Sequence, residues 1–310
     1  MEDNLKDLNI GVFRGGVSGE RDISLISGQK VFTVLKEAGY KVIDIDLKTT
    51  DAKEILYLLK KNSIDIVFIV LHGEFGEDGQ IQKIFEENNV RFTGSDSLSS
   101  YLAMDKIQSY RIFEKNGIRC PEFRVWGKDN LELSAGDFPL VIKPHYGGST
   151  LGISIIKDES QLKESVSKAK EVSDQVLIEK YIAGREFTVG ILNDKVLPVI
   201  EIKFKAELFD YSSKYDDHNL AEVTVPADLP AAVYKDVQDL SLKVYQVLGS
   251  KGAARVDLKT DNDYNPYILE LNSVPGLTGH SLLPLACKQA GIDFVRMCEE
   301  ILLSALKEAG

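Results

Sequence analysis

Near its C-terminal end the chain carries two short segments whose alternation of apolar and polar residues constrains the fold more than any other feature. Residues 252–259 (GAARVDLK) and 267–271 (YILEL) each have the pattern of a β-strand, and the connector Thr260–Pro266 consists of residues that commonly end strands and form turns. Side chains alternate between the two faces of a strand. The two segments therefore predict a β-hairpin with one apolar face and one polar face.

The polar face of this hairpin suits a metal ion and an anion. It comprises Arg255 and Asp257 from the first strand and Glu270 and Asn272 from the second. The apolar side chains expected on the opposite face are Val256, Leu258, Leu269 and Leu271. Hard cations such as Mg2+ take oxygen ligands, usually one or two carboxylates completed by phosphate oxygens, so we interpret Asp257, Glu270 and Asn272 as metal ligands. Arg255 remains to bind an anion or a negative charge that develops during a reaction.

A solvated outer face of a hairpin is the plainer interpretation of these charged residues. The strictly apolar partners of the polar side chains argue against it, as does the Asn-Ser-Val-Pro-Gly loop at residues 272–276. We therefore favour a functional role for this face.

Residues 255–258 (RVDL) and 269–282 (LELNSVPGLTGHSL) resemble the C-terminal signature of the D-alanine–D-alanine ligases, members of the ATP-grasp superfamily. The resemblance extends from about Asn9 to Leu306 and includes every motif of the family in order. It implies an α/β protein, α+β overall, with an N-terminal Rossmann-like parallel-sheet domain. A two-part ATP-grasp fold would follow, with ATP between two antiparallel β-sheets. The expected domains are residues 1–96, 97–182 and 183–310, the last including an ω-loop lid at about 203–225.

Composition restricts the partners and the compartment. The chain has 310 residues, of which 44% are hydrophobic and 27% charged, which suits a folded protein of two or three domains. A net charge of −11 argues against nucleic acid or an anionic membrane as a partner. The acidic N-terminus does not resemble a signal peptide, and the longest apolar run, Ile66–Leu71, is too short to span a bilayer. The scattered Cys120, Cys287 and Cys298 have no metal-binding spacing and are typical of reduced thiols in a cytoplasmic protein.

Strands and helices alternate over the first 94 residues, which predicts a parallel sheet. The expected strands are 9–14, 41–47, 64–71 and 90–94, the last at an edge, and the expected helices are about 20–39 and 52–61. The Gly-Gly-Val-Ser-Gly turn at residues 15–19 is not a GxGxxG motif, so it is weak evidence for a dinucleotide-binding fold. Its glycines would let a ligand approach the backbone closely.

Two motifs of this first domain gain a role from the resemblance. Residues 15–28 (GGVSGERDISLISG) resemble the first motif of the family, which implies that Glu20 binds the ammonium group of the first D-alanine. Without the resemblance, an acidic residue in a first helical turn is ordinary dipole chemistry. Residues 72–82 (HGEFGEDGQIQ) follow a strand, where ligands bind in open α/β sheets, and the resemblance makes His72 a wall of the substrate pocket. Lys83 departs from the family, which usually has Gly there.

Two lysines and a glycine-rich loop are expected to bind phosphates. A predicted helix at 99–116 carries Lys106, which the resemblance directs to the α- and β-phosphates of ATP. Residues 143–156 (KPHYGGSTLGISII) place Lys143 before a loop whose N–H groups can form an anion nest. The loop lacks the Walker pattern, which excludes a P-loop NTPase. The resemblance implies that Lys143 binds phosphate and that Ser149 joins the substrate network.

The resemblance also assigns the adenine end of the site, at residues 175–186 (QVLIEKYIAGRE). Backbone groups from Lys180 to Ile182 would read the edge of the adenine, and Glu179 would contribute beside them. Glu186 would accept hydrogen bonds from the ribose hydroxyls.

Residues 203–225 form a long, mostly irregular stretch, which in a compact domain is commonly a functional lid. It resembles the ω-loop of the family. The resemblance implies that Lys214 contacts the γ-phosphate and that Tyr215 hydrogen-bonds with Ser149 and Glu20 to close the substrate chamber. Phe209 stands where the family commonly has Tyr.

The remaining elements follow from their periodicity. Further strands are expected at 123–126, 140–143, 152–156, 175–181, 187–191 and 196–202, and helices at 159–172 and 230–248 with two more within 281–307.

Residues and resemblance together predict a cytoplasmic, ATP-dependent ligase that joins two D-alanines to D-alanyl-D-alanine through a D-alanyl phosphate. The product would serve peptidoglycan synthesis, and hence cell-wall biogenesis and cell shape. The implied cofactors are ATP and two Mg2+ ions, with Mn2+ as a substitute, and a homodimer is expected. Arg255 and the Gly276 N–H would stabilise the tetrahedral oxyanion. Ser281, at a helix start beside His280, would hold the carboxylate of the second substrate.

Two alternatives stay open. One is a related ATP-grasp ligase that takes D-lactate or D-serine as its acceptor, although Tyr215 argues against lactate. The other is a nucleotide-binding regulatory protein that has lost its chemistry. The intact set of candidate residues argues against that second alternative: Glu20, Arg255, Asp257, Glu270, Asn272 and Ser281.

Overall fold

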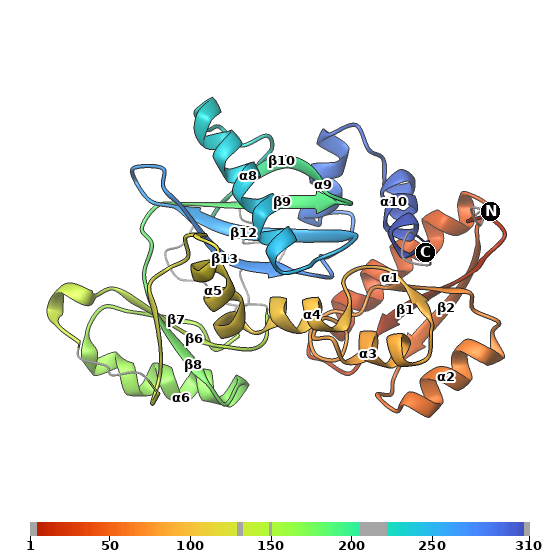
Figure 1. The fold of residues 1–310 in the computed structure, drawn as a ribbon, viewed down its shortest axis with the longest axis horizontal. Coiled ribbons are helices and arrows are strands. Elements are labelled where there is room, and N and C mark those ends of the chain that lie inside the picture. Colours follow the sequence, from red (N-terminus) through yellow and green to blue (C-terminus); the bar gives the residue numbers. More distant parts are fainter. Residues whose placement is uncertain (1–4, 129–132, 149–150, 205–221, 307–310) are drawn as a thin grey trace.

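Three β-sheets organise the chain in the computed structural model, which describes residues 5–128, 133–148, 151–204 and 222–306 (Figure 1). The first sheet has four strands in the order β2-β1-β3-β4, the second four in the order β5-β8-β6-β7, and the third five in the order β11-β10-β9-β12-β13. The first sheet is parallel and the other two are antiparallel, so the expected combination of a Rossmann-like sheet with two antiparallel sheets is confirmed.

The first sheet and its helices match the expected alternation. Its strands are β1 (Asn9–Gly15), β2 (Lys41–Leu47), β3 (Ile66–Ile69) and β4 (Arg91–Phe92), and its helices are α1 (Arg21–Glu37), α2 (Ala52–Lys61) and α3 (Gln80–Glu87). The fully apolar β3 is buried on both faces, as is usual for an inner strand of a parallel sheet. The carboxyl ends of β1 and β3 lead into the two candidate motifs at residues 15–28 and 72–82, which brings those motifs to one edge of the sheet.

The prediction of a single helix at 99–116 is wrong, because the structure has two helices there. They are α4 (Ser97–Met104) and α5 (Lys106–Lys115). Between them Asp105 has an extended backbone, and its side chain accepts hydrogen bonds from the N–H groups of Ile107 and Gln108. This N-cap starts a new helix directly at Lys106 and orients that lysine separately from α4.

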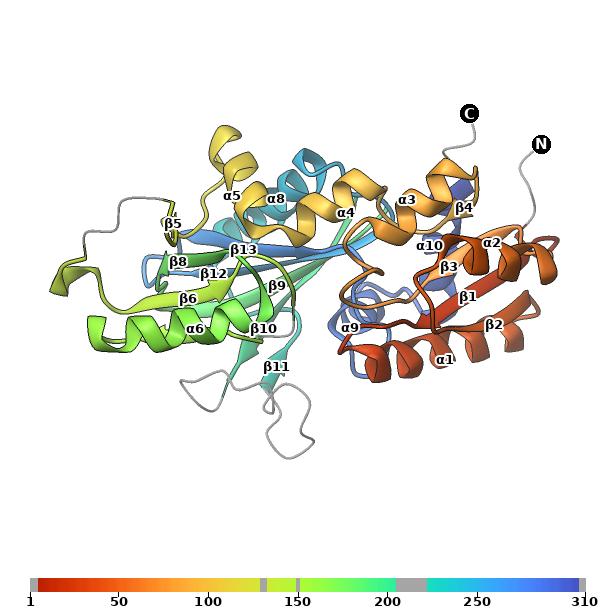
Figure 2. The ribbon, with the colours of Figure 1, turned by 90° about the horizontal axis from the view of Figure 1, so that it is seen from below.

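The second sheet carries α6 on one face. Its strands are β5 (Phe123–Val125), β6 (Leu140–Pro144), β7 (Ser154–Ile156) and β8 (Val176–Lys180), with short 3-10 turns at Ala135–Asp137 and Glu159–Gln161. Helix α6 (Leu162–Val172) begins three residues later than the expected helix because of the second turn. Its apolar side packs on Ile142 and Ile178 of the sheet, which leaves the opposite face of the sheet turned toward the third sheet (Figure 2).

The third sheet contains the hairpin with which the sequence analysis began. Its strands are β9 (Arg185–Leu192), β10 (Lys195–Lys203), β11 (Glu222–Thr224), β12 (Ala253–Thr260) and β13 (Pro266–Asn272). Helices α5 and α8 (Ala231–Val247) pack on its apolar face. Strand β11 pairs with the end of β10, and it is a short strand that the sequence analysis did not identify within the mostly irregular stretch 203–225.

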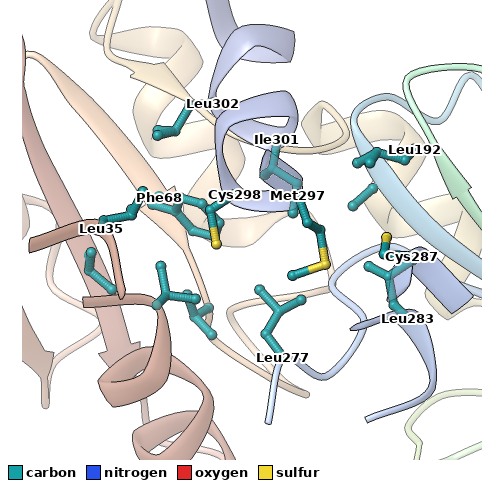
Figure 3. Packing of buried hydrophobic residues seen from close by; sticks show 14 of the residues in the cluster. Leu35, Phe68, Leu192, Leu277, Leu283, Cys287, Met297, Cys298, Ile301 and Leu302 are labelled. Carbon is teal, nitrogen blue, oxygen red and sulfur yellow. The ribbon is translucent and has the colours of Figure 1, made fainter. Parts of the chain in front are cut away.

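The last two helices, α9 (Leu282–Gln289) and α10 (Phe294–Leu306), share a core with the first sheet. Figure 3 shows Phe68 of β3 beside Cys298 of α10 in this core, with Met297 of the same helix near Leu277. The predicted domain boundaries at residues 96 and 182 coincide with changes from one sheet to the next, and the division of the chain remains a prediction. In the part of the chain that the structure describes, no helix has the length and apolar character to cross a bilayer.

Candidate active site

A cavity of about 160 Å³ lies between the second and third sheets. Its walls come from β6, β7 and β8 on one side and from β9, β12 and β13 on the other. The candidate nucleotide-binding residues that line it are Lys106, Lys143, Glu179, Lys180, Ile182 and Glu186. Two candidate metal ligands, Asp257 and Glu270, line it as well. Segments far apart in the sequence thus meet in one cleft.

A buried ion pair forms one wall of the cavity. Lys143 Nζ lies 2.7 Å from Glu179 Oε1, and both side chains are buried. Lys143 also donates a hydrogen bond of 3.0 Å to the hydroxyl of Tyr110. Among the described residues, Glu179 Oε1 has no hydrogen-bond partner of suitable geometry despite its nearness to the ammonium group. The ion pair with Lys143 offsets part of the cost of burying this carboxylate, and the oxygen atom can still accept a hydrogen bond from a ligand.

Lys106 connects the glycine-rich loop to the hairpin. Its ammonium group donates a hydrogen bond of 2.7 Å to the Gly147 carbonyl and lies 3.3 Å from Glu270 Oε2. Lys106 is buried, with 6% of its surface exposed, so water screens its positive charge only weakly within the cleft. Of the candidate loop residues, Ser149 lies outside the described residues.

The polar face of the hairpin has the expected composition. The register of β12 and β13 pairs Arg255 with Asn272 and Asp257 with Glu270. Arg255 donates two hydrogen bonds to the Asp257 carboxylate, of 2.9 and 2.8 Å, and the Asn272 amide donates one of 3.0 Å to the same group. Burial by itself would lower the pKa of Arg255, but the adjacent Asp257 carboxylate raises it above its ordinary value, so the guanidinium stays charged.

Leu269 does not lie behind this face as expected. Asp257 pairs with Glu270 whereas the next residue, Leu258, pairs with Ile268, so Leu269 is an extra residue in a β-bulge. Ile268 is fully buried in the core, and Leu269 lines the cavity next to Glu270. The strict alternation assumed for the second strand is therefore wrong at this residue.

The polar face of the β12–β13 hairpin offers two carboxylates and one amide as potential metal ligands. No group of three or more His, Cys, Asp or Glu side chains that could hold a metal ion is found over the described ranges. The potential metal ligands are the carboxylate oxygens of Asp257 and Glu270 and the amide oxygen of Asn272, which suit Mg2+ when phosphate oxygens complete its coordination.

Glu20 and His72 come together at the edge of the first sheet. Glu20 lies next to the first turn of α1, and a methyl group added at Gly148 would lie 3.5 Å from its Oε1 atom, so the carboxylate faces the glycine-rich loop. His72 is buried, with Nδ1 3.1 Å from the Val274 carbonyl and Nε2 3.3 Å from the Ser27 hydroxyl. His72 thereby joins the first sheet to the loop that follows the hairpin.

Gly276 and Ser281 are also brought together, while His280 is exposed. A methyl group added at Gly276 would lie 2.9 Å from the Ser281 hydroxyl oxygen. Ser281 is the residue before α9, and its hydroxyl accepts a hydrogen bond of 3.0 Å from the Thr278 N–H. The positive end of α9 therefore lies beside Gly276, which suits a carboxylate. Lys214 and Tyr215 lie outside the described residues.

Three residues of the site were missed by the sequence analysis. Lys259 lines the cavity with Nζ 4.8 Å from the centre of the Tyr181 ring, and burial lowers the pKa of its ammonium group. The sequence pattern could have identified Lys259, because it lies two residues after Asp257 on the same strand and therefore on the same face. Thr188, which donates to Asp257 from the neighbouring strand, and Tyr110 of α5 carry no local signal, since only the tertiary fold brings them to the site.

Comparison with known proteins gives consistent results over nearly the whole chain. Residues 48–95 match the family model described as D-ala D-ala ligase N-terminus, and residues 110–303 match that described as D-ala D-ala ligase C-terminus. A D-alanine–D-alanine ligase of Syntrophotalea carbinolica is 40% identical over 303 residues, 97% of each chain. One of Clostridium beijerinckii is 38% identical over 304 residues, 97% of this chain and 99% of the relative. The crystal structure of D-alanine–D-alanine ligase from Bacillus anthracis complexed with ATP is 35% identical, with a TM-score of 0.85 over 98% of this chain and 99% of that one.

Proposed function

The chain belongs to the D-alanine–D-alanine ligase family, and from this membership we propose that it catalyses the ATP-dependent ligation of two D-alanines to D-alanyl-D-alanine for peptidoglycan synthesis. The observation that carries the proposal is the single cleft in which lysines of α5 and the second sheet face carboxylates of the third. A phosphate chain needs such cations, and the metal ion that accompanies it needs such carboxylates.

ATP is proposed to lie along this cleft with its base at Glu179. The exocyclic amino group of adenine is a hydrogen-bond donor, and Glu179 Oε1, which pairs with Lys143 Nζ but accepts no hydrogen bond of suitable geometry from the described residues, is a buried acceptor for it. Lys143 and Lys106 would neutralise the phosphates, and Glu186 would accept from the ribose hydroxyls. Lys180 and Ile182 would read the edge of the base through their backbone groups, and Lys214 would contact the γ-phosphate.

Asp257, Glu270 and Asn272 are proposed to hold two Mg2+ ions, for which Mn2+ could substitute. Bound Mg2+ would supply charge stabilisation to the phosphate oxygens. Asp257 is held by Arg255 and Glu270 lies beside Lys106, so both carboxylates are oriented toward the cleft.

The first half of the reaction is proposed to occur beside Glu20. Its carboxylate would bind the ammonium group of the first D-alanine, within a pocket walled by His72. A carboxylate oxygen of that D-alanine attacks the γ-phosphorus of ATP, the bond from phosphorus to the β-γ bridging oxygen breaks, and ADP and D-alanyl phosphate result. Ser149 and Tyr215 are proposed to complete this chamber and to exclude water from the acyl phosphate.

In the second half, the amine of the second D-alanine attacks the carbonyl carbon of the acyl phosphate. Arg255 and the Gly276 N–H would stabilise the negative oxygen of the tetrahedral intermediate, a contribution of about 3–4 kcal/mol per donor in studied enzymes. The C–O bond to phosphate then breaks, phosphate leaves, and the nitrogen loses a proton to give the peptide. Ser281 and the start of α9, beside His280, would bind the carboxylate of the second D-alanine.

We also propose a cytoplasmic location, a homodimer and no nucleic-acid or membrane partner.

A phosphate-release assay tests the proposal. Purified protein with Mg2+ and ATP should release phosphate with D-alanine and little without it, and product analysis with D-lactate or D-serine added should show D-alanyl-D-alanine as the main product. Glu270→Gln should reduce turnover at least a hundredfold without unfolding the protein, because it removes a ligand from a cleft and not a core contact. Glu164→Gln, an exposed change on α6, is the matched control. Phosphate release that is independent of amino acid would contradict the proposed function, and normal turnover of Glu270→Gln at saturating Mg2+ would contradict the metal assignment.

A further inference from the structure

We propose that Tyr110 is a positioning residue that couples the phosphate-binding lysine Lys143 to the metal-binding carboxylate Glu270. The inference rests on the proposed function, since it concerns how the same cleft is held in shape. Tyr110 itself is set back from the cavity and touches it only through its neighbours.

The hydroxyl of Tyr110 joins the two sheets at one atom. It accepts a hydrogen bond of 3.0 Å from Lys143 Nζ on β6, and it donates one of 3.0 Å to the Leu269 carbonyl on β13. The Glu179 carboxylate lies near the same hydroxyl, since its charge adds to burial in raising the pKa of Tyr110 well above the ordinary value. The hydroxyl therefore keeps its proton and remains a donor at physiological pH.

The acceptor of that proton is the residue displaced by the β-bulge. A bulged residue has no direct partner on the neighbouring strand, so the ladder fixes its carbonyl less firmly than those of a regular pair. The Tyr110 hydroxyl supplies a partner to the Leu269 carbonyl. Because Glu270 follows directly in the chain, holding this peptide group also fixes where the Glu270 carboxylate enters the cleft.

Packing alone does not account for a tyrosine at this position. The ring is fully buried in the core of α5 and the third sheet, with its centroid 6.0 Å from that of Phe113 and 5.2 Å from that of Phe123. A phenylalanine would make the same ring contacts. The additional oxygen atom must be satisfied in the core, and the partners that satisfy it belong to the candidate site.

Tyr110→Phe removes this oxygen atom and keeps the ring. We expect the KM for ATP and the Mg2+ concentration for half-maximal rate each to rise about tenfold, the effect of one buried hydrogen bond left unmade. The KM for D-alanine should stay within about twofold, because Glu20 and Ser281 are untouched. Binding of a non-hydrolysable ATP analogue with Mg2+, measured by calorimetry without D-alanine, should weaken by a similar factor.

The matched control is Tyr245→Phe. Tyr245 is a buried tyrosine of the same core, and its hydroxyl donates to the Gly252 carbonyl at 3.3 Å, away from the cleft. Tyr245→Phe should lower the melting temperature by an amount comparable with Tyr110→Phe, but it should leave the KM for ATP and the Mg2+ concentration for half-maximal rate unchanged. Tyr110→Met is a second variant without the hydroxyl, and it should raise both of these quantities as Tyr110→Phe does.

The outcomes separate the two proposals. Equal effects of Tyr110→Phe and Tyr245→Phe on nucleotide binding, or a change confined to the KM for D-alanine, would overturn the positioning role. Loss of the folded state in both Tyr110 variants would assign the hydroxyl to stability and would overturn it also. Because the calorimetric measurement needs no D-alanine, it tests Tyr110 even if the wild-type protein fails to ligate D-alanine and the proposed function falls.

Discussion

Replacing Glu179 by glutamine is expected to weaken the use of ATP and to reduce the preference for ATP over GTP. Glu179 is 2% exposed, and its Oε1 atom pairs with the Lys143 ammonium group but accepts no hydrogen bond of suitable geometry within the described part of the chain, so it can accept one from the amino group of adenine. Guanine has a carbonyl oxygen at the corresponding position. That oxygen would face a buried carboxylate with no proton between them.

The size of the effect follows from the kind of hydrogen bond that is lost. Glutamine keeps an acceptor oxygen but loses the charge, so the loss is the difference between a bond to a charged group (about 1.5–3 kcal/mol) and a neutral bond (about 0.5–1.5 kcal/mol). A difference of about 1–1.5 kcal/mol corresponds to roughly a 5- to 13-fold loss of kcat/KM for ATP. The glutamine amide can donate to the guanine oxygen, so kcat/KM for GTP should fall less or rise. The ratio of the two values should therefore drop at least about fivefold.

The ratio also removes a complication. Glu179 pairs with Lys143, so the variant alters the lysine that we assign to the phosphates. That part of the effect is the same for both nucleotides, and it cancels when ATP is compared with GTP.

The assay is D-alanine-dependent phosphate release with each nucleotide varied. Wild type, Glu179→Gln and the exposed control Glu164→Gln are compared under the same Mg2+ excess. An unchanged ratio in Glu179→Gln, alongside an unchanged control, would refute the assignment of Glu179 to the base.

Two further predictions concern the substrate side and stability. Glu20→Gln should raise the KM for D-alanine at least tenfold with little change in the KM for ATP, since the amide keeps the shape but loses the charge paired with the substrate ammonium. Initial rates measured with each substrate varied test this prediction. A rise in the KM for ATP alone would assign Glu20 to the nucleotide site. Glu201→Gln should lower the free energy of unfolding by about 1–3 kcal/mol at neutral pH, because it removes the carboxylate that accepts hydrogen bonds of 2.7 and 2.8 Å from Arg185. The hydrogen bonds from Arg185 hold the pKa of Glu201 below its ordinary 4.5, so this stabilisation is present above pH 4.5 and is lost as the pH falls through the lowered value. Denaturant unfolding from pH 7 down to pH 3 should show a steeper loss for wild type than for Glu201→Gln, and parallel curves would count against the ion pair.

The fold was predictable where a local pattern sufficed to define an element. The strand at Lys41–Leu47 and the helix at Ala52–Lys61 have the expected bounds, because hydrophobic period and flanking turn residues specify them directly. The break at Asp105 was missed because an apolar pattern runs through it, and the side-chain cap that ends one helix and starts the next is a subtler signal. Strand β11 was missed for a different reason, since its three residues are a strand only through pairing with β10.

The residues of the candidate site also differ in whether a local sequence pattern predicts them. Residues on one strand face, such as Arg255 and Asp257, could be grouped from their spacing alone, and Lys259 could have been added by the same rule. Lys106 and Lys143 could be proposed only from the resemblance, because lysines at the ends of helices and strands are common on surfaces. Tyr110 reaches the site through the packing of α5 on the third sheet, which no local pattern specifies.

The bulge at Leu269 shows why one local irregularity can matter for the whole cleft. In a regular strand Ile268 would share a face with Glu270 and Asn272, and Leu269 would point into the core. With the extra residue, Ile268 enters the core opposite Leu258, and Leu269 joins Glu270 at the cavity. The cleft thereby gains an apolar surface next to a carboxylate, which is the combination that a nucleotide base and a metal-bound phosphate require. The same displacement presents the Leu269 carbonyl to the Tyr110 hydroxyl, so the feature that shapes the wall of the site also ties it to Lys143 on the opposite sheet.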